Sequence, residues 1–598
     1  MDNKLKTTNY GALTTVTLVF FFWGFIAAGN SVFIPFCKDY FSLDQFQSQL
    51  IDFAFYGAYY LGALGLFIYG SSTGKDLVGG WGYKKSIVFG LLFSALGAVA
   101  MIISVKLNVF SGMLFGLFIV ALGFSLQQTS ANPFMISLGD ESTGSNRINL
   151  GGGINSLGTT IGPLVIAFAL FGSGTFTQEE IANLDLWKVI VLYALVGALF
   201  VGIAALIGFS KKVPAGIVEG KPERAKKAVI ALSLITGLLI GCFAPVFASY
   251  ASKDAKTIQK NEKTIKQLNK EISNDLETAN YEVGELEESE LETIRAEVSP
   301  ENVASIEDLK SKNETLLKPM EQSRMFWLLG ALGVIVIGLM MINRVANKQK
   351  EGWGAMQYPQ LTFGMLAIFT YVGVEVAVGS NLAELLKQPK FGGLGTSEIA
   401  PYIAMFWGSL MIGRWGGAIN AFEMKKQTKQ ILRFVVPLVA FGVVLLLSLL
   451  SGHDVTPFYW YIFCVLIQII ATYLTNDRPA MTLGVFGTLA LIAMIIGLTS
   501  SGMVTIYAFL SAGLFCSIMW PCIFSLSLVG LGKFQTQGSA FLVMMILGGG
   551  IIPPIQGKLS DIIGIQESFF VGAVCFAYLA AFAFIVKGVL KKQGLTTE

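Results

Sequence analysis

Long apolar stretches separated by short polar segments recur along the whole chain. Most have about 20 residues or more, the length that an α-helix needs to cross a bilayer core of about 30 Å. We expect sixteen such spans, near residues 12–36, 47–70, 85–105, 109–136, 149–171, 187–209, 227–249, 325–343, 360–386, 399–422, 431–450, 457–475, 481–500, 504–529, 537–557 and 567–588. The pattern predicts an all-α polytopic membrane protein.

One segment breaks this pattern. Residues 251–323 contain 17 acidic and 10 basic residues and no long apolar run. Ile258, Ile265 and Ile272 repeat every seven residues, which is typical of an amphipathic, coiled-coil-like helix. A break at Ser299–Pro300 suggests a return turn. We therefore expect a helical hairpin on the outer face, which is either a partner-binding or self-association element or a solvated spacer.

The chain also contains an internal repeat. The string LGTTIGP at Leu157–Pro163 matches LGGGIIP at Leu547–Pro553, and NPFMISL at 132–138 resembles WPCIFSL at 520–526, with offsets of 390 and 388 residues. An earlier pair, 24–31 and 373–380, is offset by only 349, so an added helix pair must lie within the second half. Two six-helix halves in parallel repeat are the arrangement of major facilitator transporters, which bind substrate between the halves.

The repeat divides the chain into three expected parts. Residues 1–212 form an N-terminal six-helix half. Residues 213–358 form an insert, in which the helix pair 227–249 and 325–343 carries the hairpin 251–323. Residues 359–598 form the C-terminal six-helix half, with a second added helix pair at 431–475.

Charge fixes the expected orientation. Only 14% of the 598 residues are charged, about half the share found in globular proteins. Short loops rich in Lys and Arg, such as Lys84–Lys85 and Lys425–Lys426, fall on one face by this count of spans. The positive-inside rule makes that face cytoplasmic, and the even count puts both termini there. We expect a multi-pass protein of the cell (inner) membrane.

Several function classes are excluded by composition. The formal net charge of +3 provides no basic face for nucleic acid. The six cysteines have no metal-ligand spacing, and His453 is the only histidine. No nucleophile has a base at a recognisable spacing, and no nucleotide-binding loop is present, so we expect neither an enzyme nor a cofactor or metal site.

Polar side chains inside the apolar spans are the candidate site, because such residues are costly at membrane depth and usually face a cavity. Amides and a few aromatic rings suit a neutral polyhydroxylated ligand such as a sugar. Interhelical hydrogen bonding is the alternative role for each amide. The candidate substrate-binding residues are Asn30, Gln127, Gln128, Asn132, Asn155 and Asn381, with Tyr56 and Trp407 as stacking candidates. We see no cation in the central spans that would favour an anionic ligand.

Several strings in order resemble the fucose permease and glucose/galactose transporter family of the major facilitator superfamily. They include FFFWGFIAAGNSVFIPF, QLIDFAFYGAYYLG, QQTSANPFMISLG, NRINLGGGINSLGTTIGP, YVGVEVAVGS, IGRWGGA and MWPCIFSLSLVGLGKFQTQGSAF. The resemblance covers the twelve core helices and leaves out the acidic segment and both added helix pairs. It implies a major facilitator fold and sugar uptake, often driven by a proton or sodium gradient.

The same resemblance bears on ion coupling and gating. The family's fucose permease has an Asn-Asp pair in its first helix and a Glu in its fourth, where this chain has Asn30–Ser31 and Gln128. Glu375 matches the glucose/galactose branch and is the leading coupling candidate, followed by Asp52; we expect Glu375 to lack a positive neighbour. The loop GKDLVGGWGYKK resembles the superfamily's signature loop. The expected gating residues are Lys75, Asp76, Arg147 and Arg414.

These observations predict a secondary active importer of a neutral sugar of the fucose, glucose or galactose class, working by alternating access and coupled to H+ or Na+. The expected partners are the sugar and the lipid bilayer. Two alternatives remain. The chain could be a facilitative uniporter of a sugar or related solute, or a non-transporting sensor or scaffold that uses the 251–323 hairpin.

Overall fold

The fold is helical throughout the described part of the chain. The computed structural model describes residues 7–40, 45–171, 185–218, 224–278, 299–476 and 478–595, and for 27–40 and 45–52 it describes the backbone alone. Each of the sixteen predicted spans coincides with a helix or with a run of two or three consecutive helical segments. Thirteen described helices are long and apolar enough to cross a membrane. The all-α membrane fold is therefore confirmed.

The N-terminal half contains six long helices, and every one overlaps a predicted span. Their bounds are α1 (Tyr10–Tyr40), α2 (Gln45–Thr73), α4 (Tyr83–Lys106), α5 (Phe110–Ser137), α6 (Gly144–Phe171) and α8 (Leu186–Phe209), with the short α3 (Leu77–Trp81) between α2 and α4. The sequence of α6 contains many polar and glycine residues among its apolar ones. The helix nevertheless forms at the predicted place, where it packs on α1.

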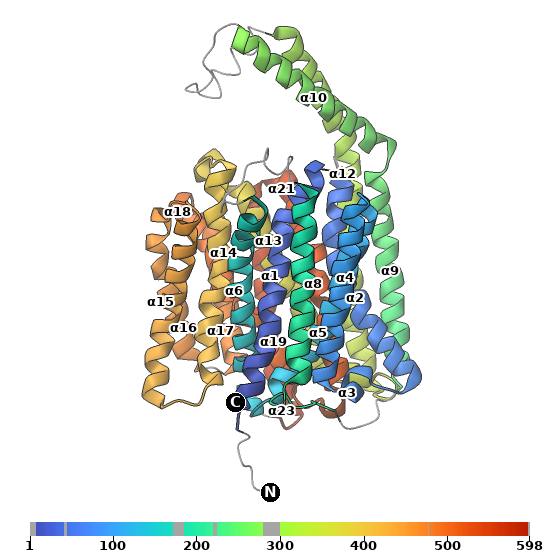
Figure 1. The fold of residues 1–598 in the computed structure, drawn as a ribbon, viewed down its shortest axis with the longest axis vertical. Helices are drawn as coiled ribbons and strands as arrows, with labels where there is room; N and C mark the ends of the chain where they lie inside the picture. The colour runs from blue at the N-terminus through green and yellow to red at the C-terminus, as the bar shows by residue number, and fades with distance from the viewer. Residues whose placement is uncertain are drawn as a thin grey trace. The chain divides into compact units, whose positions relative to one another are not determined.

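The C-terminal half repeats the plan with broken helices. It contains α13 (Pro359–Leu386), α14 (Thr396–Ala418), α17 (Pro479–Thr499), α18 (Gly502–Cys516) followed by α19 (Met519–Leu528), α20 (Gln535–Met544) followed by α21 (Gly548–Ile563), and α23 (Phe570–Lys592). Figure 1 shows α1 beginning and α23 ending at the same end of the bundle, which we call the terminal end.

Helix contacts repeat between the halves. The first helix packs on the fifth in both, as α1 with α6 and α13 with α21. Likewise α4 contacts α5 and α8, while α17 contacts α18 and α23. The same neighbours at equivalent positions are the packing expected of two related six-helix units. The halves meet where α6 packs on α14 and where α5 packs on α20.

Two helix pairs lie outside these twelve. One consists of α9 (Lys226–Tyr250) and the 49-residue α12 (Pro300–Lys348). The other consists of α15 (Lys426–Leu450) and α16 (Ile462–Thr475), preceded by a 3-10 segment at 456–461; α15 packs on α14, and α16 packs on α15, α17 and α18. Many large apolar side chains on α15 and α16 are exposed, as expected for lipid-facing helices.

Residues 236–332 belong to a second compact unit, which we describe by itself. Within it α10 (Lys253–Thr278) pairs with the first part of α12. Ile272 and Ile306 are buried together, and Asn261 Nδ2 donates to Asn313 Oδ1 over 2.7 Å. The isoleucine spacing thus marks the face along which the two helices meet. A role in partner binding or self-association stays a prediction.

Candidate functional site

A buried charged network lies between the halves. Arg414 of α14 donates through Nε to the Ser517 carbonyl (3.0 Å), through Nη1 to Ser156 Oγ (2.8 Å), and through Nη2 to the Tyr371 hydroxyl (3.1 Å) and Glu375 Oε1 (3.4 Å). Side-chain exposure is 11% for Arg414 and 13% for Glu375. Ser156 lies on α6, in the N-terminal half. One guanidinium therefore joins the coupling candidate to the opposite half.

Two sequence expectations are wrong at this point. Glu375 does have a positive neighbour, because Arg414 reaches it from the following long helix. The central helices also hold a cation, although Glu375 offsets its charge. Arg414, expected as a gating residue, lies four residues before the end of α14 and bonds to Glu375, and its gating role stays a prediction. Ser156 and Tyr371 were not singled out, because hydroxyl groups in apolar helices carry no signal of their own.

Gln127 is a packing residue in the structure. Its side chain has no exposed surface; Trp23 Nε1 donates to its Oε1 over 2.7 Å, and its Nε2 donates to Ser94 Oγ over 3.1 Å. These bonds tie α5 to α1 and α4. The interhelical alternative therefore describes Gln127 better than the substrate-contact expectation does.

Gln128 is different, because it is half-buried and its amide reaches toward α2. Its Nε2 donates to the Tyr59 hydroxyl over 3.2 Å. One turn further along α5, Asn132 donates to the backbone oxygen of Gln128 over 3.1 Å, and among the described groups its buried Oδ1 has no hydrogen-bond partner. Among the described residues none donates to Gln128 Oε1, so this amide oxygen can accept from a ligand hydroxyl.

The remaining amides are only partly engaged. Asn155 is half-buried on α6, where its Nδ2 donates to the Phe20 carbonyl of α1 over 3.0 Å, and it directly precedes Ser156 of the charged network. Asn381 is buried and donates to the Ala377 carbonyl one turn earlier on α13 over 2.8 Å. Asn155 thus lies beside the network, while Asn381 bonds within its own helix.

Both aromatic candidates pack against glycines. A Cβ added to Gly549 of α21 would meet Tyr56 Cε1 at 2.8 Å, and one added to Gly379 would meet Trp407 Cζ2 at 3.0 Å. Both rings are half-buried, so each retains some accessible surface. Asn30 and Asp52 lie in the stretch for which side chains are outside the described part, so their roles stay predictions.

The terminal end of the bundle is held together by bonds between the halves. Asn146 Nδ2 donates to the Gly417 carbonyl (2.9 Å), and Trp415 Nε1 donates to the Gly153 carbonyl (3.1 Å). Further round, Ser539 Oγ donates to the Thr129 carbonyl (2.8 Å). The glycine runs GGG at 151–153 and GG at 416–417 are the sequence feature that could have predicted this contact, because glycine lets helices approach closely.

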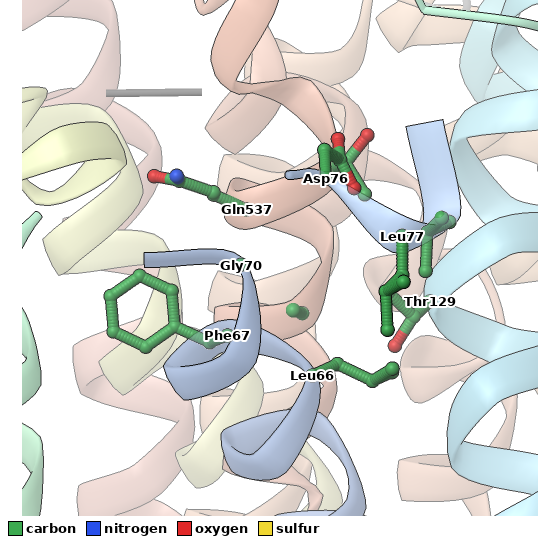
Figure 2. A pocket seen from close by; sticks show the side chains of 10 residues that line it. Leu66, Phe67, Gly70, Asp76, Leu77, Thr129 and Gln537 are labelled. Atoms are coloured by element: carbon green, nitrogen blue, oxygen red, sulfur yellow. The ribbon is translucent and has the colours of Figure 1, made fainter. Parts of the chain in front are cut away.

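The signature loop packs against the second half. Asp76 caps α3 by accepting from the Gly79 backbone N–H over 2.9 Å, and it lines a cavity of about 30 Å³ together with Thr129, Thr536 and Gln537. Figure 2 shows Asp76 and Gln537 on the segments around this cavity. Burial raises the pKa of Asp76 above its usual value, while the Gly79 N–H opposes that rise.

The other two gating candidates behave differently. Arg147 is fully buried and donates to the carbonyls of Met135, Ile136 and Asp140 and to Thr143 Oγ1, all in its own half. It therefore holds the turn between α5 and α6. Lys75 is exposed next to Asp76.

Comparisons with known proteins match the chain over nearly its full length. It is 27% identical over 578 residues to a glucose/galactose transporter of Brucella abortus, which covers 96% of this chain and 94% of the relative. It is 26% identical over 593 residues to a putative glucose/galactose transporter of Helicobacter pylori (98% and 99%), and 24% identical over 566 residues to the L-fucose-proton symporter of Escherichia coli (94% and 90%). No protein-family model matches the chain.

Solved structures agree on the fold. A crystal structure of the E. coli fucose:proton symporter aligns with a TM-score of 0.56 at 19% identity, covering 97% of this chain and 99% of that one. A second, in the outward conformation, gives 0.55 at 21% identity, covering 96% and 98%. With two matching six-helix halves and relatives along nearly the whole chain, this protein has the fold of the fucose:proton symporter and is similar in sequence to glucose/galactose transporters and to the L-fucose-proton symporter.

Proposed function

We propose that this protein is a secondary active transporter that imports a neutral sugar of the fucose, glucose or galactose class by alternating access, coupled to protons. The observation that carries the proposal is the buried Glu375–Arg414 pair, which is linked to Ser156 of the opposite half. A charge pair at the interface between two halves that move relative to each other can couple ion binding to that movement. The names of the full-length relatives support the substrate class.

Neutrality of the ligand follows from the charge balance. Arg414 would attract an anionic solute if it were unpaired, but Glu375 lies against it and offsets its charge. The groups left for a ligand are neutral, namely the amide oxygen of Gln128 and the rings of Tyr56 and Trp407. Hydroxyl groups need such acceptors, and the C–H face of a sugar ring packs on aromatic surface.

Proton coupling would act through Glu375. Protonation removes the negative charge that Arg414 pairs with, and Arg414 also holds Ser156 of the other half. The link between the halves therefore depends on the protonation state of one carboxylate. A proton is preferred to sodium because one relative is a fucose-proton symporter, and because Glu375 is already paired with a cation that would repel Na+.

The expected setting is the cell (inner) membrane with both termini in the cytoplasm. The basic loops at Lys84–Lys85, Lys211–Lys212 and Lys425–Lys426 support this orientation. The halves are bonded together at the terminal end, so substrate would enter from the opposite, outer side in this conformation.

The test is uptake by proteoliposomes that contain the purified full-length chain. Labelled fucose, glucose and galactose are each supplied with no gradient, with an inward proton gradient and with an inward sodium gradient. We expect one of these sugars to accumulate above its external concentration only with the proton gradient, and a protonophore should abolish the accumulation. Accumulation with sodium alone would reject proton coupling, and no flux of any sugar would reject the transport function.

A facilitative uniporter is the second candidate. It is favoured by the same ion pair, because a carboxylate locked against Arg414 could stay charged throughout the cycle. A uniporter would equilibrate sugar without ever accumulating it, so the same liposomes separate the two candidates.

A further inference from the structure

A groove on the lipid-facing side of the C-terminal half combines positive charge with an apolar floor. It lies between α17 and α23 and has a volume of about 420 Å³. The groove exists because small residues face each other there: Gly484 of α17 lies opposite Ala583 of α23, whose Cβ would be 3.5 Å from a Cβ added to that glycine. Its lining shares no residue with the Glu375–Arg414 network.

The charge is concentrated at one end of the groove. Arg478 immediately precedes α17, and Lys587 lies just over one turn before the end of α23. Because α17 and α23 run in opposite directions, these two positions meet at the terminal end of the bundle. The start of α17 adds the partial positive charge of a helix N-terminus. All three features favour an anionic group at the same place.

The rest of the lining is apolar. Val485, Leu489 and Phe584 continue along the groove away from the two cations, and the Phe584 side chain is 71% exposed on the outer surface. Such a surface contacts lipid chains in a membrane protein. The groove therefore has the polarity of a molecule with an anionic head and a hydrocarbon tail.

A second apolar hollow in the same bundle lacks the two cations that the groove between α17 and α23 has. It measures about 630 Å³ between α1, α6, α14 and α15, and Glu423 is the charged residue in its lining. The lining of that hollow offers no cation to an anionic headgroup, whereas the lining of the groove between α17 and α23 offers two. Volume alone does not distinguish the two hollows, but charge does.

We propose that the groove between α17 and α23 binds one anionic phospholipid, with its phosphate between Arg478 and Lys587 and one acyl chain along Val485, Leu489 and Phe584. Basic pockets on the cytoplasmic side of membrane proteins bind anionic lipid headgroups, and anionic lipids enrich the cytoplasmic leaflet. The groove faces that leaflet if the terminal end is cytoplasmic.

The test is native mass spectrometry of the full-length chain in detergent, titrated with dioleoylphosphatidylglycerol or dioleoylphosphatidylcholine. We expect one tightly bound phosphatidylglycerol and weaker phosphatidylcholine binding. Each cation should contribute about fivefold to the affinity, so Arg478→Gln with Lys587→Gln should weaken phosphatidylglycerol binding about twenty-fivefold. The matched control is Lys425→Gln with Lys426→Gln, which removes the same charge at the same end and should change binding less than twofold.

A second variant tests the apolar floor. Val485→Trp fills the groove while leaving both cations in place, so phosphatidylglycerol binding should fall although the charge is unchanged. Thermal unfolding in phosphatidylcholine shows whether each variant is folded. Equal losses in both double variants, undiminished binding in Val485→Trp that is folded, or displacement of the lipid by millimolar inorganic phosphate would overturn the proposal.

Discussion

The two halves of the bundle share a packing plan but differ in chemistry. In the N-terminal half, the polar side chains described on α5 pair with neutral groups, as in the Gln127–Trp23 and Gln128–Tyr59 pairs, and the buried Arg147 bonds to neutral groups at the start of α6. In the C-terminal half, Glu375 of α13 and Arg414 of α14 form a buried ion pair. The two halves therefore share their helix contacts but differ in the polar side chains that these helices hold.

The halves also differ in where their polar groups reach. The amides of Gln127 and Gln128 bond within their own half, whereas Arg414 and Trp415 both bond to α6 of the other half. The C-terminal half supplies the Glu375–Arg414 ion pair, and both halves donate bonds between them, through Arg414 and Trp415 on one side and Asn146 on the other.

The largest effect is expected from Arg414→Ala. It leaves Glu375 as a buried charge without its partner and removes the bonds to Ser156 and Tyr371, at a cost of about 3–5 kcal/mol in the free energy of unfolding. Uptake should disappear, and thermal unfolding should occur at a lower temperature. Lys425→Ala serves as the control, because it removes an exposed cation that immediately precedes α15. Normal uptake by a folded Arg414→Ala protein would end the idea that the halves are joined by this charge.

Glu375→Gln should separate binding from coupling. The amide preserves the shape of the side chain but cannot change its charge with pH, so the Arg414 contact no longer responds to protons. Accumulation of sugar under a proton gradient should be lost, while exchange of internal for external sugar continues. Glu384→Gln, on the same helix but exposed and paired with Lys387, should leave accumulation intact. If Glu375→Gln still concentrates sugar, the carboxylate is a structural partner of Arg414.

Gln127 and Gln128 provide a matched pair within the N-terminal half. Gln128→Ala should weaken sugar binding about fivefold to 150-fold, since a lost hydrogen bond costs about 1–3 kcal/mol when its partner stays unpaired. Gln127→Ala should instead lower stability and leave the affinity of the folded protein nearly unchanged. Sugar affinity can be followed by equilibrium binding, and stability by thermal unfolding. The reverse outcome would place the sugar on the α1–α4 side of α5.

The smallest effect is expected from deleting residues 251–323 and joining the ends with a flexible loop. The twelve core helices already provide both halves and the interface between them, so the initial uptake rate should stay within about twofold of the parent (a change of about 0.4 kcal/mol). A deleted protein that inserts and binds sugar but does not transport it would show that the comparison between halves is incomplete, because the hairpin then takes part in gating.

Much of the architecture could be predicted from the sequence because membranes and helices impose fixed lengths. An apolar stretch of about 20 residues forms a helix in a bilayer since its backbone groups must bond to one another. All sixteen spans, the kinship of the halves and the isoleucine-lined contact of α10 with α12 followed from length, repeat offsets and periodicity. The amides could be found as candidates for the same reason, because a polar side chain in an apolar helix needs a partner.

Which partner each polar residue finds was decided only by the tertiary structure. Glu375 and Arg414 are 39 residues apart, and their meeting depends on how α13 and α14 align and on the glycines that let α6 approach α14. Gln127 and Gln128 are neighbours of the same type, yet one is enclosed by α1 and α4 while the other points to α2. Successive side chains on a helix point about 100° apart, so adjacent identical residues face different neighbours, and only the packed bundle determines which one can meet a ligand.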